Sequence, residues 1–308
     1  KLPWRRETEL FTQGEDGYHT YRVPAVSVAP DGTILAFCEA RKTSHYDFHE
    51  IHIALRRSTD GGVTWEPMRV IASNGDDTIG NPCVVVDRET ATVWLSYCRN
   101  NTEVYVIHSS DNGLSWSDPR EITADVKRDG WTWYATGPGH GIQLRSGSLI
   151  IPCNHADTPR GMRADPPFFR SHVIYSDDHG TNWHLGGRSP VDQVNECEVV
   201  ELTDGALLLN MRNYDSSRRN RQVAMSRDGG LTWGGQRFDD ALIEPICQAS
   251  IRRAGKALSE INPIVFSNPA SIDKRVNMTV RTRLDDGVSW PFSHVLHSGP
   301  SGYSCLAL

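Results

Sequence analysis

The sequence has no long run of apolar residues. Its longest apolar stretches, such as Ile34 to Phe37 and Leu207 to Leu209, fall far short of the ~20 residues that a membrane-spanning helix needs. It also has no excess of positive charge, because the formal net charge of the 308 residues is −6 and acidic and basic residues are interspersed. We therefore expect neither an integral membrane protein nor a nucleic-acid binder that relies on an overall positive field.

Paired cysteines and zinc-ligand patterns are absent as well. None of the seven cysteines lies in a CxxC pair or near a histidine at zinc-ligand spacing, so we expect no structural zinc and no cofactor. Their odd number argues against a complete disulfide framework, and their apolar surroundings predict buried free thiols. The compartment stays open, with a secreted or periplasmic location slightly favoured over the cytoplasm. The cysteines are Cys38, Cys83, Cys98, Cys153, Cys197, Cys247 and Cys305.

Helical periodicity is nearly absent, and an octapeptide repeat stands out instead. Its form is Ser-x-Asp-x-Gly-x-Thr/Ser-Trp, and the aspartates at positions 60, 111, 178, 228 and 285 lie 51, 67, 50 and 57 residues apart. That spacing is about one propeller blade per step. The copies read STDGGVTW at 58–65, SSDNGLSW at 109–116, SDDHGTNW at 176–183, SRDGGLTW at 226–233 and, in a degraded form, RLDDGVSW at 283–290.

Each copy stands between two β-rich stretches, which predicts a hairpin turn. In such a turn the Asp accepts backbone hydrogen bonds, the Gly supplies a positive φ and the Trp packs on the adjoining sheet. Calcium binding is the alternative, but the copies lack the further oxygen ligands and the bidentate Glu of an EF-hand. With glycine and proline spread between short strands, we expect an all-β chain, a β-propeller, with residues 1–308 as a single domain.

Loops between blades converge near the axis of a propeller, so site residues should be few and scattered along the sequence. Charges within apolar, strand-like stretches are the candidates. A single buried arginine is better explained by a salt bridge, because an unpaired buried charge costs several kcal/mol. A whole set of them favours the binding of an anion. The set comprises Arg22, Glu39, Arg41, Glu196, Arg212 and Arg275.

With these residues in view, the chain resembles the exo-sialidases (neuraminidases) of glycoside hydrolase family 33 over nearly its whole length. The Asp-box repeat alone is weak evidence, because non-enzymatic propellers carry it, whereas the ordered set of three Arg, Asp, Glu and Tyr is specific. The resemblance implies six blades, with the closure of the last one left open. Its motifs are YRVP at 21–24, NPC at 81–83, GPGH at 137–140, NECEVVEL at 195–202, LNMR at 209–212, FSNPAS at 266–271 and GYS at 302–304.

The resemblance implies that Arg22, Arg212 and Arg275 clamp the substrate carboxylate. A planar guanidinium suits that task because it binds a carboxylate bidentately and stays charged. The resemblance makes Tyr303 the nucleophile and Glu196 its general base. A phenol with a pKa near 10 needs such a base, and a neutral phenol avoids the repulsion that a carboxylate nucleophile would meet from the substrate's own carboxylate.

The resemblance also implies that Asp47, nine residues before Arg56, is the acid/base. Two nearby acidic residues, Glu39 and Glu50, are alternatives for this role. By the resemblance, Glu39 pairs with Arg22 and holds it in place, whereas Glu50 is expected to face solvent. For the base, Glu198 and Glu201 could be confused with Glu196, and the alignment with LNMR favours Glu196.

Several contacts are less specific. Arg41 and Glu39 are assigned to substrate binding, and Ile79 and Asn81 to the pocket for the N-acyl group. The run from Trp131 to Tyr134 is assigned to the glycerol tail of the substrate, with the core as the alternative for all of these apolar and amide residues. The loop from His155 to Phe169 is expected to form a rim. One departure from the family is Cys305, which stands where an Asp is common.

The sequence thus predicts an exo-α-sialidase that releases terminal α-linked sialic acids from oligosaccharides, glycoproteins or glycolipids with net retention. Two alternatives stay open. One is a non-catalytic propeller that binds sialylated glycans, which the Tyr and Glu pair disfavours because binding alone does not require it. The other is a trans-sialidase, or a hydrolase that prefers the deaminated sugar. Linkage preference and oligomeric state do not follow from the sequence.

Overall fold

A computed structural model describes residues 6–157, 168–255, 262–284, 286 and 289–308, which form five sheets. The first contains β1 (Thr20–Val28), β2 (Ile34–Arg41), β3 (Ile51–Ser58) and β4 (Arg69–Ala72). The second contains β5 (Ile79–Asp87), β6 (Thr92–Arg99), β7 (Glu103–Ser109) and β8 (Arg120–Glu121), with β10 (Gly139–His140) parallel to β5. The third contains β11 (Ile142–Gln143), β12 (Leu149–Ala156), β13 (Phe169–Ser176) and β14 (His184–Arg188), with β9 (Trp133–Thr136) paired to β12.

The fourth sheet contains β15 (Val194–Glu201), β16 (Leu207–Asn213), β17 (Asn220–Ser226) and β18 (Gly234–Ile243). The fifth contains β19 (Ser250–Arg253), β20 (Ile264–Pro269), β21 (Val276–Arg283) and β22 (Phe292–Pro300). A four-residue helix, α1 (Thr123–Val126), follows β8. In the described ranges, no helix has the length and apolar character that crossing a membrane would require.

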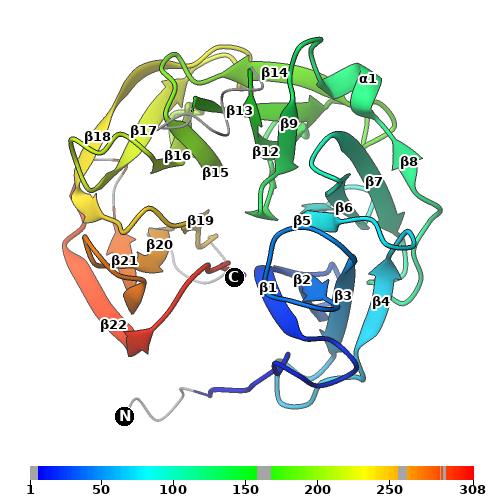
Figure 1. Ribbon diagram of the computed structural model, residues 1–308. Helices are drawn as coiled ribbons and strands as arrows, with labels where there is room; N and C mark the ends of the chain where they lie inside the picture. The colour runs from blue at the N-terminus through cyan, green and yellow to red at the C-terminus, as the bar shows by residue number, and fades with distance from the viewer. Residues whose placement is uncertain (1–5, 158–167, 256–261, 285, 287–288) are drawn as a thin grey trace.

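The sheets follow one another in chain order around a common centre, and the C-terminal residues lie at that centre beside β1 and β19 (Figure 1). This arrangement confirms the predicted all-β propeller. The predicted number of six blades is wrong for the described residues, which form five sheets. Because the repeats lie 50 to 67 residues apart, five sheets already occupy the stretch from Thr20 to Pro300. The ring stays open between the first and the fifth sheet (Figure 1).

The first four octapeptides lie in the turns that lead into β4, β8, β14 and β18, as their sequence predicts. In the first copy, Asp60 Oδ1 accepts hydrogen bonds from the Val63 and Thr64 backbone N–H groups at 3.0 and 2.9 Å, and Oδ2 accepts one from the Thr64 hydroxyl at 2.6 Å. These bonds from Thr64 lower the pKa of Asp60 to about 2. The Asp of the fifth copy, at position 285, lies outside the described residues.

The turns also join each sheet to the one before it. Arg69 on β4 donates to the Gly113 and Leu114 carbonyls of the second turn, and Arg120 on β8 donates to the Gly180 carbonyl of the third at 2.7 Å. A Cβ on Gly180, whose φ is +85°, would lie 2.2 Å from the Trp94 ring. Glycine is therefore required there both for the backbone conformation and for the close approach to the neighbouring sheet.

The apolar core is divided among the interfaces between successive sheets. Each fully buried large apolar side chain contributes about 1.5–3 kcal/mol, and the middle strands are buried along their length, as β16 is at all seven positions. Four clusters fill the four interfaces from the first to the fifth sheet. Representative pairs are Phe37 with Leu95, Val106 with Ile174, Ile150 with Leu209, and Leu208 with Phe266.

The cysteines are free, as predicted. Six are buried and Cys305 is half-buried. Burial raises the pKa of Cys83 and Cys153 well above the usual value, so these thiols stay neutral and pack as small apolar side chains.

A buried histidine pair lies in the third sheet. His155 Nδ1 is 2.9 Å from His172 Nδ1, and the ring of Trp131 stacks on His155 with centres 3.5 Å apart. His155 Nε2 lies 2.9 Å from Asp157. Burial lowers the pKa of His155 to about 3 despite Asp157, and burial followed by the charge of His155 lowers the pKa of His172 well below its usual value. Both rings are therefore neutral in the folded protein at neutral pH.

This pair predicts a loss of stability in acid. Below about pH 6.5 the unfolded chain binds protons at both histidines and the folded chain does not, so the free energy of unfolding falls as pH decreases from 6.5 toward 3. Each histidine contributes a slope of up to ~1.4 kcal/mol per pH unit. Urea unfolding of the wild type and of His172→Gln at pH 7.5 and 5.0 measures it. The variant should lose less stability between the two pH values, and equal losses would contradict the assignment.

Candidate active site

Three of the predicted site residues lie near the start of inner strands. The register with the next strand shifts within the first residues of β1, β5 and β15, and these bulges contain Arg22, Asn81 and Glu196 respectively. Val23 and Asn81 both have a φ of +58°, which is unusual for a residue with a side chain and marked for a β-branched one. Bulges of this kind bend a strand and redirect its side chains, so three sheets present side chains at the same end of the ring.

Three predicted residues are in direct contact. The Tyr303 hydroxyl donates a hydrogen bond of 2.5 Å to Glu196 Oε1. Arg212 Nη1 lies 2.6 Å from Glu196 Oε2 and 3.0 Å from the Tyr303 oxygen. The three side chains come from β15, from β16 and from the C-terminal segment, so the fold assembles them from sequence positions up to 107 residues apart.

The electrostatics of this contact hold Tyr303 neutral and Arg212 charged. Burial, followed by the charge of Glu196, raises the pKa of Tyr303 well above its usual value, and Arg212 offsets only part of this. Burial disfavours the charge on Arg212, but Glu196 and then Tyr303 outweigh it and raise the pKa of Arg212. At neutral pH the phenol is therefore protonated, and a carboxylate stands at hydrogen-bond distance to accept its proton.

Of the other two arginines, Arg275 lies beside this contact. The Arg275 guanidinium lies over the Tyr303 ring, 5.7 Å from its centre, and Nη2 donates to the Ile246 carbonyl at 3.1 Å. Arg22 is exposed on β1. Cys305 ties the Tyr303 segment to the same strand, because its sulfur accepts a 3.3 Å hydrogen bond from the Val26 backbone N–H.

A second cluster contains Asp47, Arg41, Glu39 and Asn81. Arg41 Nη1 lies 2.7 Å from Asp47 Oδ1, and Arg41 Nε and Nη2 donate to Glu39 Oε2 at 3.0 and 2.7 Å. Glu39 Oε1 accepts the Asn81 backbone N–H at 2.8 Å. Burial raises the pKa of Glu39, although Arg41 lowers it. The Asp47 side chain is 86% exposed and thus open to a substrate.

This cluster corrects the expected partner of Glu39. The sequence resemblance pairs Glu39 with Arg22, but the carboxylate binds Arg41 and the Asn81 amide instead. Glu39 and Arg41 are two residues apart on β2, so their side chains leave the same face of the sheet. Glu50, expected to face solvent, is half-buried with a carboxylate oxygen 3.5 Å from His52 Nε2.

The remaining predicted contacts lie mainly in the core. Ile79 is 2% exposed within the cluster between the first two sheets, and its place in an N-acyl pocket stays a prediction. Trp131 and Tyr134 are buried in the cluster between the second and third sheets, so the alternative of core packing holds for them. Residues 158–167, most of the expected rim loop, lie outside the described residues.

The comparisons with known proteins decide the family. The BNR repeat-like domain model matches residues 32–307. The chain is 31% identical to Sialidase-3 of Bos taurus, covering 97% of this chain and 85% of that protein. The chain belongs to the sialidase family. It is 36% identical to the sialidase of Micromonospora viridifaciens over 99% of this chain and 50% of that protein. A solved Hadza microbial sialidase, Hz136, superposes with a TM-score of 0.86 at 31% identity, covering 96% of this chain and 62% of that one.

The chain spans only part of several of these sialidases, 50% of the Micromonospora protein and 59% of the sialidase of Bacteroides fragilis. The solved sialidase resembles this chain both in fold and in sequence. In the described part of this sialidase-family chain, β22 is exposed, and the ring of sheets is open between the first and the fifth sheet (Figure 1).

One side chain beside the central contact, Tyr214, carries no signal in the sequence. The Tyr214 ring lies under the Arg212 guanidinium, 4.8 Å from its centre, and the Tyr214 hydroxyl accepts a 3.3 Å hydrogen bond from Asn195 Nδ2. Tyr214 also contacts Phe169 with ring centres 5.7 Å apart. Tyr214 follows the LNMR motif by two residues, and only the folded geometry shows that its ring supports an arginine of this sialidase-family site.

Proposed function

We propose that this chain is an exo-α-sialidase, which hydrolyses terminal α-linked sialic acids of oligosaccharides, glycoproteins or glycolipids with net retention. The observation that carries the proposal is the contact of Tyr303 with Glu196 and Arg212. Binding alone would not require a phenol bonded to a carboxylate. The apolar clusters that join each sheet to the next support one catalytic domain, residues 1–308.

In the first step the Tyr303 oxygen attacks the anomeric carbon of the sugar while its proton passes to Glu196. Asp47 gives its proton to the departing oxygen, so the leaving group departs as a neutral alcohol. The product is a sugar joined to Tyr303. The raised pKa of Tyr303 keeps the phenol neutral before substrate arrives, which avoids repulsion with the substrate carboxylate and makes Glu196 necessary as the proton acceptor.

In the second step the Asp47 carboxylate takes a proton from water as the water oxygen attacks the anomeric carbon. The bond to Tyr303 breaks, and the phenol regains its proton from Glu196. Two displacements at one carbon restore the original configuration. Arg212, Arg275 and Arg22 bind the substrate carboxylate in both steps. The position of Arg275 over the Tyr303 ring supports this role, because the carboxylate is attached to the carbon that Tyr303 attacks.

The acid role of Asp47 predicts a loss that depends on the leaving group. A sugar hydroxyl needs a proton to depart, whereas an acidic phenol barely does. Asp47→Ala should therefore lose about 10²- to 10³-fold in kcat/KM on sialyllactose and about tenfold or less on an activated aryl sialoside. The steady-state rates on both substrates measure it. Added azide should speed turnover of the aryl substrate if loss of the base slows the second step.

Glu50→Ala is the matched control for this prediction, because Glu50 belongs to the same loop and has a carboxylate oxygen 3.5 Å from His52 Nε2. It should change both rates little. Equal proportional losses on the two substrates in Asp47→Ala would contradict the assignment, and a leaving-group dependence that appears in Glu50→Ala would move the acid there.

The proposed activity itself is tested by release of a fluorogenic leaving group from its α-sialoside, beside the deaminated analogue and with lactose added as an acceptor for sialyl transfer. Release from the sialoside supports the hydrolase. Faster release from the deaminated analogue, or sialyl transfer to the acceptor, would favour the second alternative. Binding of sialyllactose without release would favour a non-catalytic propeller.

A further inference from the structure

The segment that carries Tyr303 has no strand partner. Residues 301–308 belong to none of the described strands, so no ladder of backbone hydrogen bonds fixes their position. Gln248 supplies a substitute. Its Oε1 accepts the Ser304 backbone N–H at 2.9 Å, and its Nε2 donates to the Ser304 carbonyl at 2.9 Å. Because one side-chain amide binds both backbone groups of the residue after Tyr303, it holds that backbone as a neighbouring strand would.

Further hydrogen bonds support the clamp. Gln248 is 1% exposed and Ser304 is half-buried, so the two bonds are partly shielded from water. The Ser304 hydroxyl donates to the Ser267 carbonyl at 3.0 Å, and the Leu306 backbone N–H donates to the Ser250 hydroxyl at 3.0 Å. These contacts lie on the far side of Ser304 from Tyr303, and none of them touches the reacting groups.

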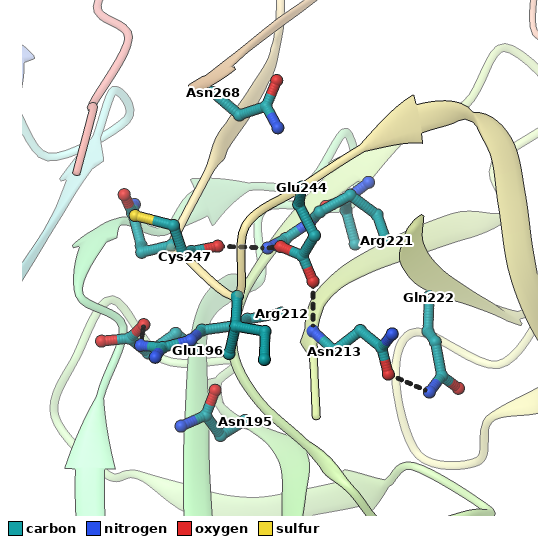
Figure 2. Close-up of polar contacts among 12 residues, drawn as sticks. Asn195, Glu196, Arg212, Asn213, Arg221, Gln222, Glu244, Cys247 and Asn268 are labelled. Atoms are coloured by element: carbon teal, nitrogen blue, oxygen red, sulfur yellow. Dashed lines mark hydrogen bonds and ion pairs between the residues drawn. The ribbon is translucent and has the colours of Figure 1, made fainter. Parts of the chain in front are cut away.

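A buried ion pair fixes the segment in front of Gln248. Arg221 Nη1 lies 2.7 Å from Glu244 Oε2 and donates to the Cys247 carbonyl at 2.8 Å, with both charged side chains at most 1% exposed. Glu244 Oε1 accepts the backbone N–H of Asn213 at 2.6 Å. Figure 2 shows Glu244 between Arg221 and Asn213, with the Cys247 carbonyl directed at Arg221.

This pair therefore connects the predicted catalytic groups through the chain. Asn213 follows Arg212, and Cys247 stands between Gln248 and Ile246, whose carbonyl accepts a hydrogen bond from Arg275. The segment 244–248 thus binds the backbone beside Arg212, the side chain of Arg275 and the backbone beside Tyr303. No pattern in the sequence singles out these residues.

We propose that Gln248 is a positioning residue for Tyr303, which holds the phenol in line for attack through the backbone of Ser304. The inference rests on the proposed sialidase function for its kinetic consequence, and on the geometry alone for the clamp. A misplacement of about 1 Å at a reacting group can cost 10²-fold in rate. Substrate binding depends instead on the arginines and should change little.

The test compares Gln248→Met with Gln143→Met. Methionine keeps the length and loses both hydrogen bonds. Gln143 is the matched control because it is also buried, binds the Arg88 backbone N–H at 2.9 Å and donates to Asp87, away from Tyr303. Gln248→Met should lower kcat about 10- to 100-fold, with KM and the inhibition constant of an unsaturated sialic-acid analogue within about threefold of wild type. Gln143→Met should keep kcat within about twofold.

Two further measurements separate the clamp from the activity. Hydrogen exchange followed by mass spectrometry should show faster exchange in the peptide that contains Ser304 for Gln248→Met, and unchanged exchange there for Gln143→Met. Gln248→Glu keeps the acceptor for the Ser304 N–H, and its kcat should fall between wild type and Gln248→Met. It also serves as the test variant should Gln248→Met not fold.

A kcat for Gln248→Met equal to that of Gln143→Met would overturn the proposal, as would unchanged exchange at Ser304. A wild type that is inactive on every sialoside would instead overturn the proposed function. In that case the exchange measurement still decides whether Gln248 holds the Tyr303 segment.

Discussion

Tyr303→Phe should lower kcat/KM on an aryl α-sialoside by about three orders of magnitude or more, because the change removes the attacking oxygen and keeps the ring. The ring still lies under Arg275, so substrate binding should survive. Glu196→Gln should cause a comparable loss, since the phenol, whose pKa is raised by burial and by Glu196, then has no base. Steady-state kinetics and inhibitor binding on the same preparations measure both effects.

The two losses should not add. Tyr303 and Glu196 act as one device through their 2.5 Å hydrogen bond, so the double variant should be about as slow as the slower single one. Tyr97→Phe is the control, because Tyr97 is a buried phenol stacked on Tyr105 in the second sheet. A double variant whose loss equals the product of the single losses would contradict a coupled pair, and so would a Tyr303→Phe enzyme that keeps most of its rate.

Arg275→Ala should weaken binding of an unsaturated sialic-acid analogue by about 2–5 kcal/mol, because a desolvated ion pair loses one partner. That range corresponds to about 30- to several-thousand-fold in the inhibition constant. Arg275 is the best of the three arginines to remove. Arg212 also bonds to Glu196 and Tyr303, so its loss would disturb the catalytic pair as well as the clamp.

The substrate carboxylate provides the control for this prediction. Against an analogue in which an alcohol replaces the carboxylate, Arg275→Ala and wild type should bind about equally. Arg237→Ala, which removes an exposed arginine on the outer strand β18, should change neither constant. An inhibition constant that stays unchanged in Arg275→Ala would remove Arg275 from the proposed clamp.

The sequence predicts the propeller well because each repeat forms its turn through contacts within its own eight residues. Each octapeptide closes its own turn, so Asp60 and Thr64 bond to each other whatever the rest of the chain does. The number of blades is not local. The resemblance implies six, whereas the described residues form five sheets, and no single turn carries information about how many sheets make up a ring.

The site also contains residues that the sequence predicts and residues that it does not. Arg212, Glu196 and Tyr303 were predictable as a set through recognisable motifs, and the structure brings them into contact. The partner of Glu39 could not be predicted, because two arginines stand within reach of its carboxylate. Arg22 lies opposite Glu39 on the neighbouring strand, and Arg41 lies two residues further along the same strand. The Gln248 clamp has no sequence signal at all, since it arises from the path of a segment without strand partners.

The central claim is that Tyr303 bonds covalently to the sugar during turnover. The measurement is mass spectrometry of the protein after reaction with a sialosyl fluoride that carries a second fluorine at C3, which slows release of the sugar from the enzyme. One added sugar, mapped by proteolysis to the peptide that contains Tyr303 and absent in Tyr303→Phe, is the predicted result. A label on Glu196 or Asp47, or undiminished labelling of Tyr303→Phe, would contradict it.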